Sequence, residues 1–107
     1  MKALCVIAAT AVFSVSPVVA FAADDGEALF KKHNCSLCHT PDKKVLGPTP
    51  RDIADKYRGN KDAQAMLEKK VRNGGGGVWG KIPMPPVAKS ISDESIKTIV
   101  QWVLSAQ

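Results

Sequence analysis

Two cysteines and a histidine lie within five consecutive residues, in the order Cys35-Ser36-Leu37-Cys38-His39. This C-x-x-C-H spacing is typical of covalent haem attachment. Two intervening residues let one turn of chain present both sulfurs to neighbouring vinyl groups, and the adjacent imidazole is then carried under the iron. We predict that Cys35 and Cys38 bind one haem c through thioether bonds and that His39 is an iron ligand.

Three other kinds of site use closely spaced cysteines: a zinc knuckle, a thioredoxin-type redox pair and a plain disulfide. Zinc normally needs a second pair of ligands, and His33 is the only other histidine in the chain. A thioredoxin-type pair belongs in a βαβ unit, and no segment shows the sustained alternation of strands. A plain disulfide would suit an oxidising compartment. Haem attachment is the preferred interpretation, and His33 is expected to be a surface residue.

Two methionines outside the N-terminal leader could provide a second iron ligand. Met66 follows a helical pattern and is best explained as a packing residue. Met84 lies between Pro83 and Pro85, whose fixed φ angles exclude a helix and restrict the backbone. A thioether held in this way loses little freedom when it binds. We therefore predict that Met84 is the second ligand.

Coordination by one histidine and one methionine leaves no open position on the iron and raises the reduction potential. This combination suits electron transfer better than oxygen or peroxide chemistry, so we expect a carrier and not an enzyme. The alternative is a haem sensor or peroxidase-like protein in which Met84 detaches to admit a small ligand.

Two further groups are expected near the haem. A ligating histidine usually donates its other ring N–H to a carbonyl, and the turn of Leu46, Gly47 and Pro48 follows the attachment sequence closely enough to supply one. Trp79 precedes Met84 in the same loop, and it either packs on the haem or donates its indole N–H to a propionate.

Four short helices are predicted around these residues, at about 25–34, 49–59, 62–73 and 92–104. Asp25, Thr49 and Ser92 are the predicted N-caps, whereas Gly59 and Gly74 follow the second and third helices. The last helix has the clearest apolar stripe and should belong to the core. Segments 40–48 and 74–91 are long for loops in so small a domain. The predicted fold class is all-α, with long loops wrapped around one haem.

The first 22 residues have the features of a signal peptide. Lys2 precedes an apolar run that extends to Val15, and Ala20-Phe21-Ala22 provides an A-x-A cleavage site. We expect cleavage after residue 22, a mature domain of residues 23–107, and no stable membrane insertion after cleavage.

The charge distribution bears on the partners. Loss of the leader lowers the formal charge from +5 to +4, and acidic side chains are interleaved with the basic ones throughout. Without an aromatic ladder, this pattern does not favour a nucleic-acid surface. Four lysines lie in the two long loops: Lys43, Lys44, Lys81 and Lys89. We expect a monomer that docks on redox proteins with acidic faces.

The mature segment resembles the short class I bacterial monohaem cytochromes c, the group that feeds electrons to periplasmic nitrite reductases and terminal oxidases. The resemblance rests on residues 29–31, 35–39, 47–48, 73–74, 78–80, 82–86 and 102–105. It implies the class I cytochrome c fold over residues 23–107 and a periplasmic one-electron carrier. It also implies that His39 and Met84 are the axial ligands, that the Pro48 carbonyl accepts from His39, and that Trp79 contacts a propionate.

The resemblance further implies that a basic residue, Lys70 or Arg72, assists Trp79 at the propionate. Two features depart from the family pattern. Many relatives carry an Asn or Gln after the Met-Pro-Pro run as a donor near the ligand sulfur, whereas this chain has Val87. About two extra residues also lie between Pro86 and the last helix.

Overall fold

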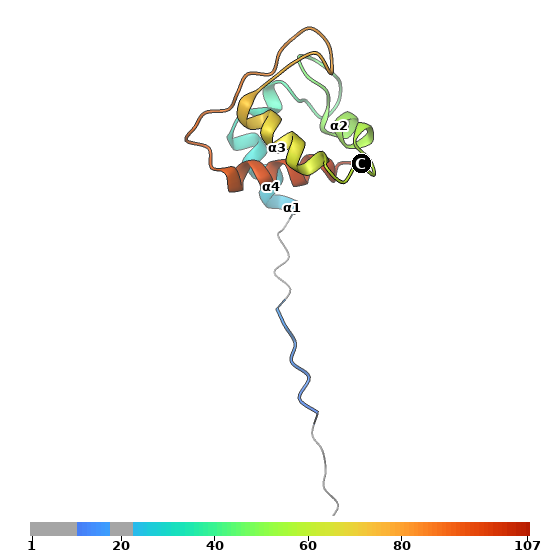
Figure 1. Ribbon diagram of the computed structural model, residues 1–107, viewed down its shortest axis with the longest axis vertical. Helices are drawn as coiled ribbons and strands as arrows, with labels where there is room; N and C mark the ends of the chain where they lie inside the picture. Colours follow the sequence, from blue (N-terminus) through green and yellow to red (C-terminus); the bar gives the residue numbers. More distant parts are fainter. Residues whose placement is uncertain (1–10, 18–22) are drawn as a thin grey trace, which may run out of the picture.

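The computed structural model describes residues 11–17 and 23–107. The described elements are α1 (Ala23–Lys32), a short 3₁₀ helix η1 (Cys35–Leu37), α2 (Pro50–Lys56), α3 (Ala63–Asn73) and α4 (Asp93–Leu104) (Figure 1). Within these residues there is no strand, and an isolated bridge joins Gly75 to Met84. The all-α prediction is confirmed. The predicted cleavage site at residues 20–22 lies outside the described residues, so the domain boundary stays a prediction.

The N-termini of α2 and α4 are capped as predicted. At α2, the Asp52 amide donates to the Thr49 hydroxyl over 3.1 Å, and the Thr49 amide donates to the Asp52 carboxylate over 3.3 Å. This reciprocal pair is a capping box, and Pro50 occupies the first helical position, where its missing N–H costs nothing. At α4, the Ser92 hydroxyl accepts from the Ser95 amide over 3.1 Å.

Three predicted helix boundaries, both ends of α1 and the end of α2, were wrong by a few residues. α1 begins at Ala23, so Asp25 lies inside the helix and is not its N-cap. α1 also ends earlier than expected, at Lys32, because Asn34 takes a left-handed conformation with φ of 60°. α2 ends at Lys56, and the predicted stop at Gly59 instead lies in the turn that follows, with φ of 77°.

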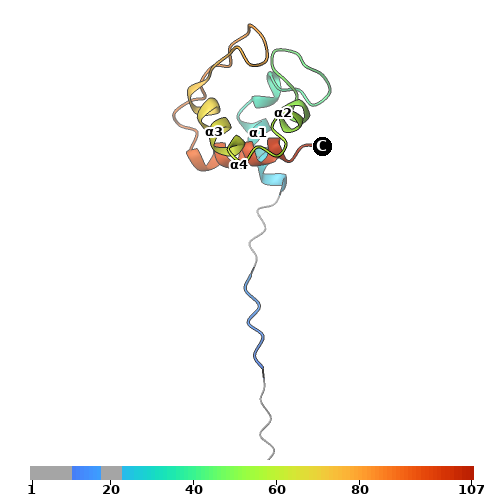
Figure 2. The same ribbon diagram turned by 45° about the vertical axis from the view of Figure 1, so that its right-hand side comes forward.

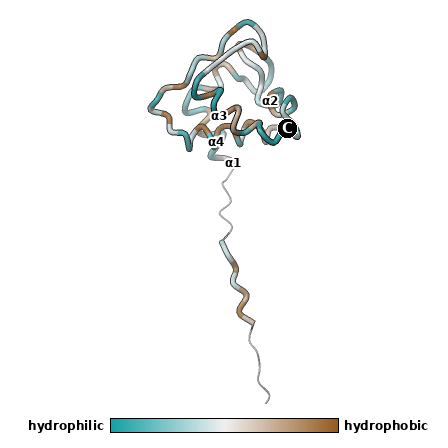
Figure 3. Tube along the Cα trace, viewed as in Figure 1, coloured by the Kyte–Doolittle hydropathy of each residue, from teal (hydrophilic) through white to brown (hydrophobic). Residues whose placement is uncertain are grey.

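α4 is the central element of the core. It packs against α1, α2 and α3, and its buried side chains are Ile96, Ile99, Val100 and Val103. Each such aliphatic side chain contributes about 1.5–3 kcal/mol when removed from water. Hydrophobic and hydrophilic residues both occur along α4 in Figure 3, as expected of a helix with one buried face.

α1 and α4 cross in close contact at the base of the domain (Figure 1). A Cβ placed on Gly26 would lie 2.2 Å from the Trp102 Cβ, so only glycine permits this approach. Beside the crossing, Phe30 packs with Ile99 and Val103, and the Phe30 and Trp102 rings lie 4.9 Å apart. The tips of the two long loops extend on the opposite side of the domain from α4 (Figures 1 and 2).

No helix among residues 11–17 and 23–107 is both long and apolar enough to cross a membrane.

Candidate haem site

The attachment segment follows α1 through a sharp turn and forms η1. The Asn34 backbone makes this turn in the left-handed region, which asparagine tolerates better than most residues. The Cys38 and His39 amides then both donate to the Cys35 carbonyl, over 3.2 and 2.9 Å. These two bonds to one carbonyl close a tight turn. The turn carries both cysteine sulfurs and the His39 imidazole, as the spacing predicts.

No disulfide joins Cys35 and Cys38, and both residues are half-buried. Cys35 packs against the cluster of Phe30, Ile99 and Val103. Burial raises the pKa of the Cys35 thiol, the neighbouring Cys38 adds to the rise, and a backbone hydrogen bond opposes it. Because the thiolate is the species that attacks in disulfide exchange, a raised pKa slows the pairing of Cys35 with Cys38.

His39 is fixed by a hydrogen bond across the first long loop. Its Nδ1 lies 2.8 Å from the Pro48 carbonyl oxygen, and since a carbonyl can only accept, Nδ1 carries the proton. Nε2 is thereby left as the nitrogen with a free lone pair, which is the atom a metal needs. The Gly47 amide closes the same loop by donating to the Cys38 carbonyl over 3.0 Å.

Gly47 also limits what can lie beside the imidazole. A Cβ at this position would lie 2.8 Å from the His39 Cε1 and 2.9 Å from its Nδ1, so a side chain here would push the ring out of place. On another side, the Phe30 ring centroid lies 6.5 Å from that of His39. The imidazole is therefore held by a glycine, a carbonyl and an aromatic ring.

Met84 lies in the second long loop and is half-buried. Its backbone pairs with Gly75 in both directions, over 2.7 and 3.0 Å, which forms the isolated bridge. Gly74, the C-cap of α3, packs directly on this stretch: a Cβ there would lie 2.5 Å from the Met84 carbonyl oxygen and 2.8 Å from the Pro86 nitrogen. The end of α3 is thus the surface on which the Met84 backbone rests.

Trp79 is held by two lysines that the sequence did not connect with it. The Lys44 ammonium donates to the Trp79 carbonyl over 2.6 Å, and so joins the two long loops. The Lys56 ammonium lies 5.2 Å from the centroid of the indole, within the range of a cation–π contact. Lysines have no sequence signature for such long-range contacts, so only the fold reveals them.

Two residues lie in other surroundings than the sequence suggested. Met66 was expected to be a packing residue, but it is 40% exposed. Arg72 was a candidate for assisting Trp79, but its guanidinium binds Asp93 and the carbonyls of Ala88 and Ile91. Lys70, whose side chain lies against Gly75, remains the basic residue on the Met84 side of α3.

The residue set fits a haem c. Two thiols and an imidazole with its Nδ1 proton fixed come from one turn, and a thioether comes from the opposing loop. Large apolar side chains of both loops and of η1 are exposed and would give a porphyrin apolar contacts: Leu37, Val45, Leu46, Val78 and Ile82. By contrast, no group of three or more His, Cys, Asp or Glu side chains within residues 11–17 and 23–107 could hold a zinc ion.

Comparison with known proteins agrees with this fit. The Cytochrome c family model matches residues 23–107. Cytochrome c-551 of Pseudomonas aeruginosa is 47% identical over 83 residues, covering 78% of each chain. Cytochrome c-552 of Nitrosomonas europaea is 43% identical over 88 residues, covering 82% of this chain and 84% of the relative.

Solved structures give the same result. The crystal structure of wild-type Nitrosomonas europaea cytochrome c552 matches with a TM-score of 0.71 and 43% identity, over 76% of this chain and 99% of that one. A class 1 cytochrome from Sideroxydans lithotrophicus matches with a TM-score of 0.63 and 33% identity, over 77% and 92%. The chain belongs to the cytochrome c family. Within it, the chain is of the small monohaem class I type and carries one covalently bound haem c.

Proposed function

We propose that this protein is a periplasmic one-electron carrier whose haem is anchored by Cys35 and Cys38 and ligated by His39 and Met84. In this proposal it shuttles electrons between respiratory-chain donors and periplasmic reductases or terminal oxidases. Residues 1–22 act as a signal peptide that is removed on export, which leaves residues 23–107 as the working domain. The protein is not itself an enzyme.

The observation that carries the proposal is the hydrogen bond between His39 Nδ1 and the Pro48 carbonyl. It sets the tautomer, leaves Nε2 as the coordinating atom and increases the basicity of the ligand. Donation from His39 Nδ1 to the carbonyl of the buried residue Pro48 also keeps the ring from rotating between oxidation states. Small reorganisation of this kind is what a one-electron carrier requires.

Met84 is supported as the second ligand by the way its backbone is held. The pair of bonds to Gly75 and the adjacent prolines restrict the loop before any ligand is bound. Met66, the alternative, is 40% exposed and lines a surface pocket on α3. A methionine ligand raises the reduction potential, which suits a carrier that feeds terminal acceptors.

Trp79 and Lys70 are the proposed contacts of the haem propionates. Trp79 is half-buried, and its backbone is fixed from the opposing loop by Lys44. Its indole N–H is a donor without acceptor properties, which matches a carboxylate. Lys70 lies at the junction of α3 and the Met84 loop, where its ammonium would balance a propionate charge.

The partners are proposed to be redox proteins with acidic faces. Lys43, Lys81 and Lys89 are exposed on the long loops. Transient electron-transfer complexes are small, and charge complementarity acts mainly on their association rate. Lys44 is shared between this role and its bond to Trp79.

Absorption spectra of the oxidised and reduced holoprotein test the proposal. Low-spin haem in both states, with the weak ferric band of a methionine–iron bond, is the expected result. High-spin ferric haem would favour the haem-sensor or peroxidase-like alternative. The matched pair Met84→Ala and Met66→Ala assigns the band: the first variant should lose it and the second should keep it. Retention of the band in Met84→Ala would contradict the proposed ligation.

A further inference from the structure

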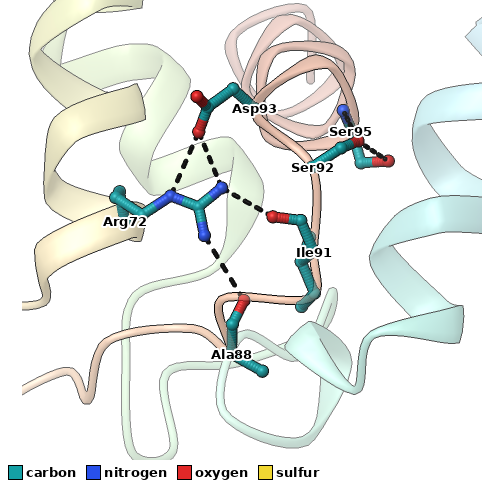
Figure 4. A network of polar contacts seen from close by, with 6 residues as sticks. All are labelled: Arg72, Ala88, Ile91, Ser92, Asp93 and Ser95. Carbon is teal, nitrogen blue, oxygen red and sulfur yellow. Dashed lines mark hydrogen bonds and ion pairs between the residues drawn. The ribbon is translucent and has the colours of Figure 1, made fainter.

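Arg72 makes a four-bond network between three parts of the fold (Figure 4). It lies in the last turn of α3, and its side chain is only 26% exposed. Nη2 donates to the Ile91 carbonyl over 2.6 Å, and Nη1 donates to the Ala88 carbonyl over 3.3 Å. Nε and Nη2 also donate to one carboxylate oxygen of Asp93, over 3.1 and 2.7 Å.

The two carbonyls and the carboxylate differ in what they contribute. The Asp93 side chain is 93% exposed, and ion pairs so open to water contribute little to stability. The carbonyl bonds come from a charged, largely buried donor, which makes them stronger than neutral hydrogen bonds. They bracket residues 88–91, whose own turn bond joins the Ile91 amide to the Ala88 carbonyl over 3.0 Å. Arg72 therefore holds a four-residue turn by its two ends.

This turn continues the Met84 loop along the face of α3. The Val87 amide donates to the Val71 carbonyl over 3.2 Å, one residue before Arg72. Pro85 and Pro86 separate Val87 from Met84, and their fixed φ angles make that connection stiff. This restricted connection is the route by which a displacement at residues 87–88 would reach Met84.

The first part of the Met84 loop is thus held by backbone contacts, and its last part is held by the Arg72 side chain. Gly74 and Gly75 hold Met84, and Val71 holds Val87. From Ala88 to the N-cap of α4, the chain is joined to α3 through the Arg72 guanidinium.

We propose that Arg72 is a positioning residue that clamps the far side of the Met84 loop and so controls how readily Met84 leaves the iron. The inference rests on the proposed ligation by Met84. Arg72 acts through the Ala88 and Ile91 carbonyls, and Asp93 serves mainly to orient the guanidinium.

Displacement of Met84 by added imidazole in the ferric holoprotein tests the clamp. The imidazole concentration at which half of the methionine–iron band is lost gives the apparent imidazole affinity. The rate of this loss at high imidazole gives the rate at which Met84 leaves the iron. Arg72→Met keeps the length of the side chain but removes all its donors, and we expect about tenfold tighter imidazole binding, equivalent to about 1.4 kcal/mol. Arg72→Lys should lie between this variant and the wild type, because a single ammonium cannot span both carbonyls. Asp93→Asn should change the affinity less than about twofold.

Arg58→Met is the matched control. Arg58 pairs with Asp55 on α2 in an exposed ion pair, with 69% of its side chain accessible, and within the described residues its side chain forms no hydrogen bond or ion pair with the Met84 loop. It should leave imidazole binding unchanged. An equal change in Arg58→Met and Arg72→Met would overturn the clamp.

Amide hydrogen exchange separates positioning from a general loss of stability. In Arg72→Met, exchange at Val87 and Ile91 should accelerate more than exchange at Val100 in the α4 core. Equal acceleration at all three amides would contradict the proposal, because it would indicate a global effect. If Met84→Ala abolishes the methionine–iron band while Arg72→Met binds imidazole as the wild type does, the clamp alone is wrong. If Met84→Ala keeps the band, the proposed function is wrong at its sixth ligand.

Discussion

The two long loops bring their candidate ligands to the haem site by different means. The loop after the attachment segment is closed by short-range bonds, from Gly47 to Cys38 and from His39 to Pro48. The Met84 loop has one closure of similar span, the paired bonds between Gly75 and Met84, and its remaining bonds join more distant segments: Val71 and Arg72 on α3, and Lys44 on the other loop. A locally closed loop keeps its geometry when the domain loosens, whereas a loop held by tertiary contacts does not. The histidine side of the site should therefore persist under conditions in which the methionine side opens.

Met84→Ala should have the largest effect, because it removes the methionine side of the site and leaves the histidine side in place. The haem should stay covalently bound, because the attachment turn does not depend on the Met84 loop. The reduction potential should fall, and ferrous iron should bind carbon monoxide, which the wild type excludes. Redox titration and carbon monoxide difference spectra measure both effects. Unchanged access to carbon monoxide would mean that the thioether of Met84 is not on the iron.

Gly74→Ala tests the surface on which the Met84 backbone rests. Gly74 has φ of 72° and ψ of −171°, a region that glycine alone populates, and a Cβ there would meet the Met84 carbonyl at 2.5 Å. Strain and clash together should cost about 2–4 kcal/mol of unfolding free energy and weaken the methionine–iron band. Denaturant titration and the ferric spectrum give the two results.

Gly59→Ala is the control for Gly74→Ala. Gly59 also has a positive φ, of 77°, but a Cβ there would meet no atom within 4 Å. It should cost only about 1–2 kcal/mol and leave the spectrum unchanged. Equal losses in the two variants would show that the close approach to Met84 contributes nothing.

Lys81→Glu compares the two loops as docking surfaces. Lys81 lies between Trp79 and Met84, so its charge moves with the Met84 loop. Electron transfer to an acidic partner should be several-fold slower at low ionic strength, and the difference should shrink as salt screens the encounter. Stopped-flow kinetics over a salt series measures it, with Lys97→Glu on α4 as the control. Equal rates for Lys81→Glu and wild type at low salt would place the docking surface elsewhere.

Val87→Asn should have the smallest effect. It tests whether residue 87 of the Met84 loop influences the proposed ligand sulfur. The Val87 backbone is fixed by its bond to Val71, so a new amide side chain would start from a defined position. If a donor near the ligand sulfur matters, the reduction potential should shift, with about 59 mV for each tenfold change in the one-electron equilibrium. Potentiometric titration that gives the same value for both proteins would show that residue 87 does not reach the sulfur.

The difference between short-range and long-range contacts also explains which features could be predicted from the sequence. The attachment turn, the capping box at Thr49 and the stripe on α4 depend on residues within a few positions of one another, and each was predicted. The Pro48 acceptor follows its histidine by nine residues and was within reach of a local argument. Contacts across 16 to 35 residues, such as those of Arg72 and Lys44, have no local pattern. Arg72 was accordingly one of two basic residues, with Lys70, considered as a helper of Trp79, and its actual neighbours follow from the packing of α3 against α4 and the loop before it.

The close crossing at Gly26 has a consequence for the order of events during synthesis. Its partner Trp102 follows Gly26 by 76 residues, so α1 cannot complete its packing until α4 has been made. Until then, Phe30 and Cys35 lack Ile99 and Val103, the α4 side chains that cover them. The sulfurs are thus most accessible in the incomplete chain and become half-buried only when the last helix docks. Because α4 is made after the attachment segment, the cysteines have an interval in which they are open to chemical modification.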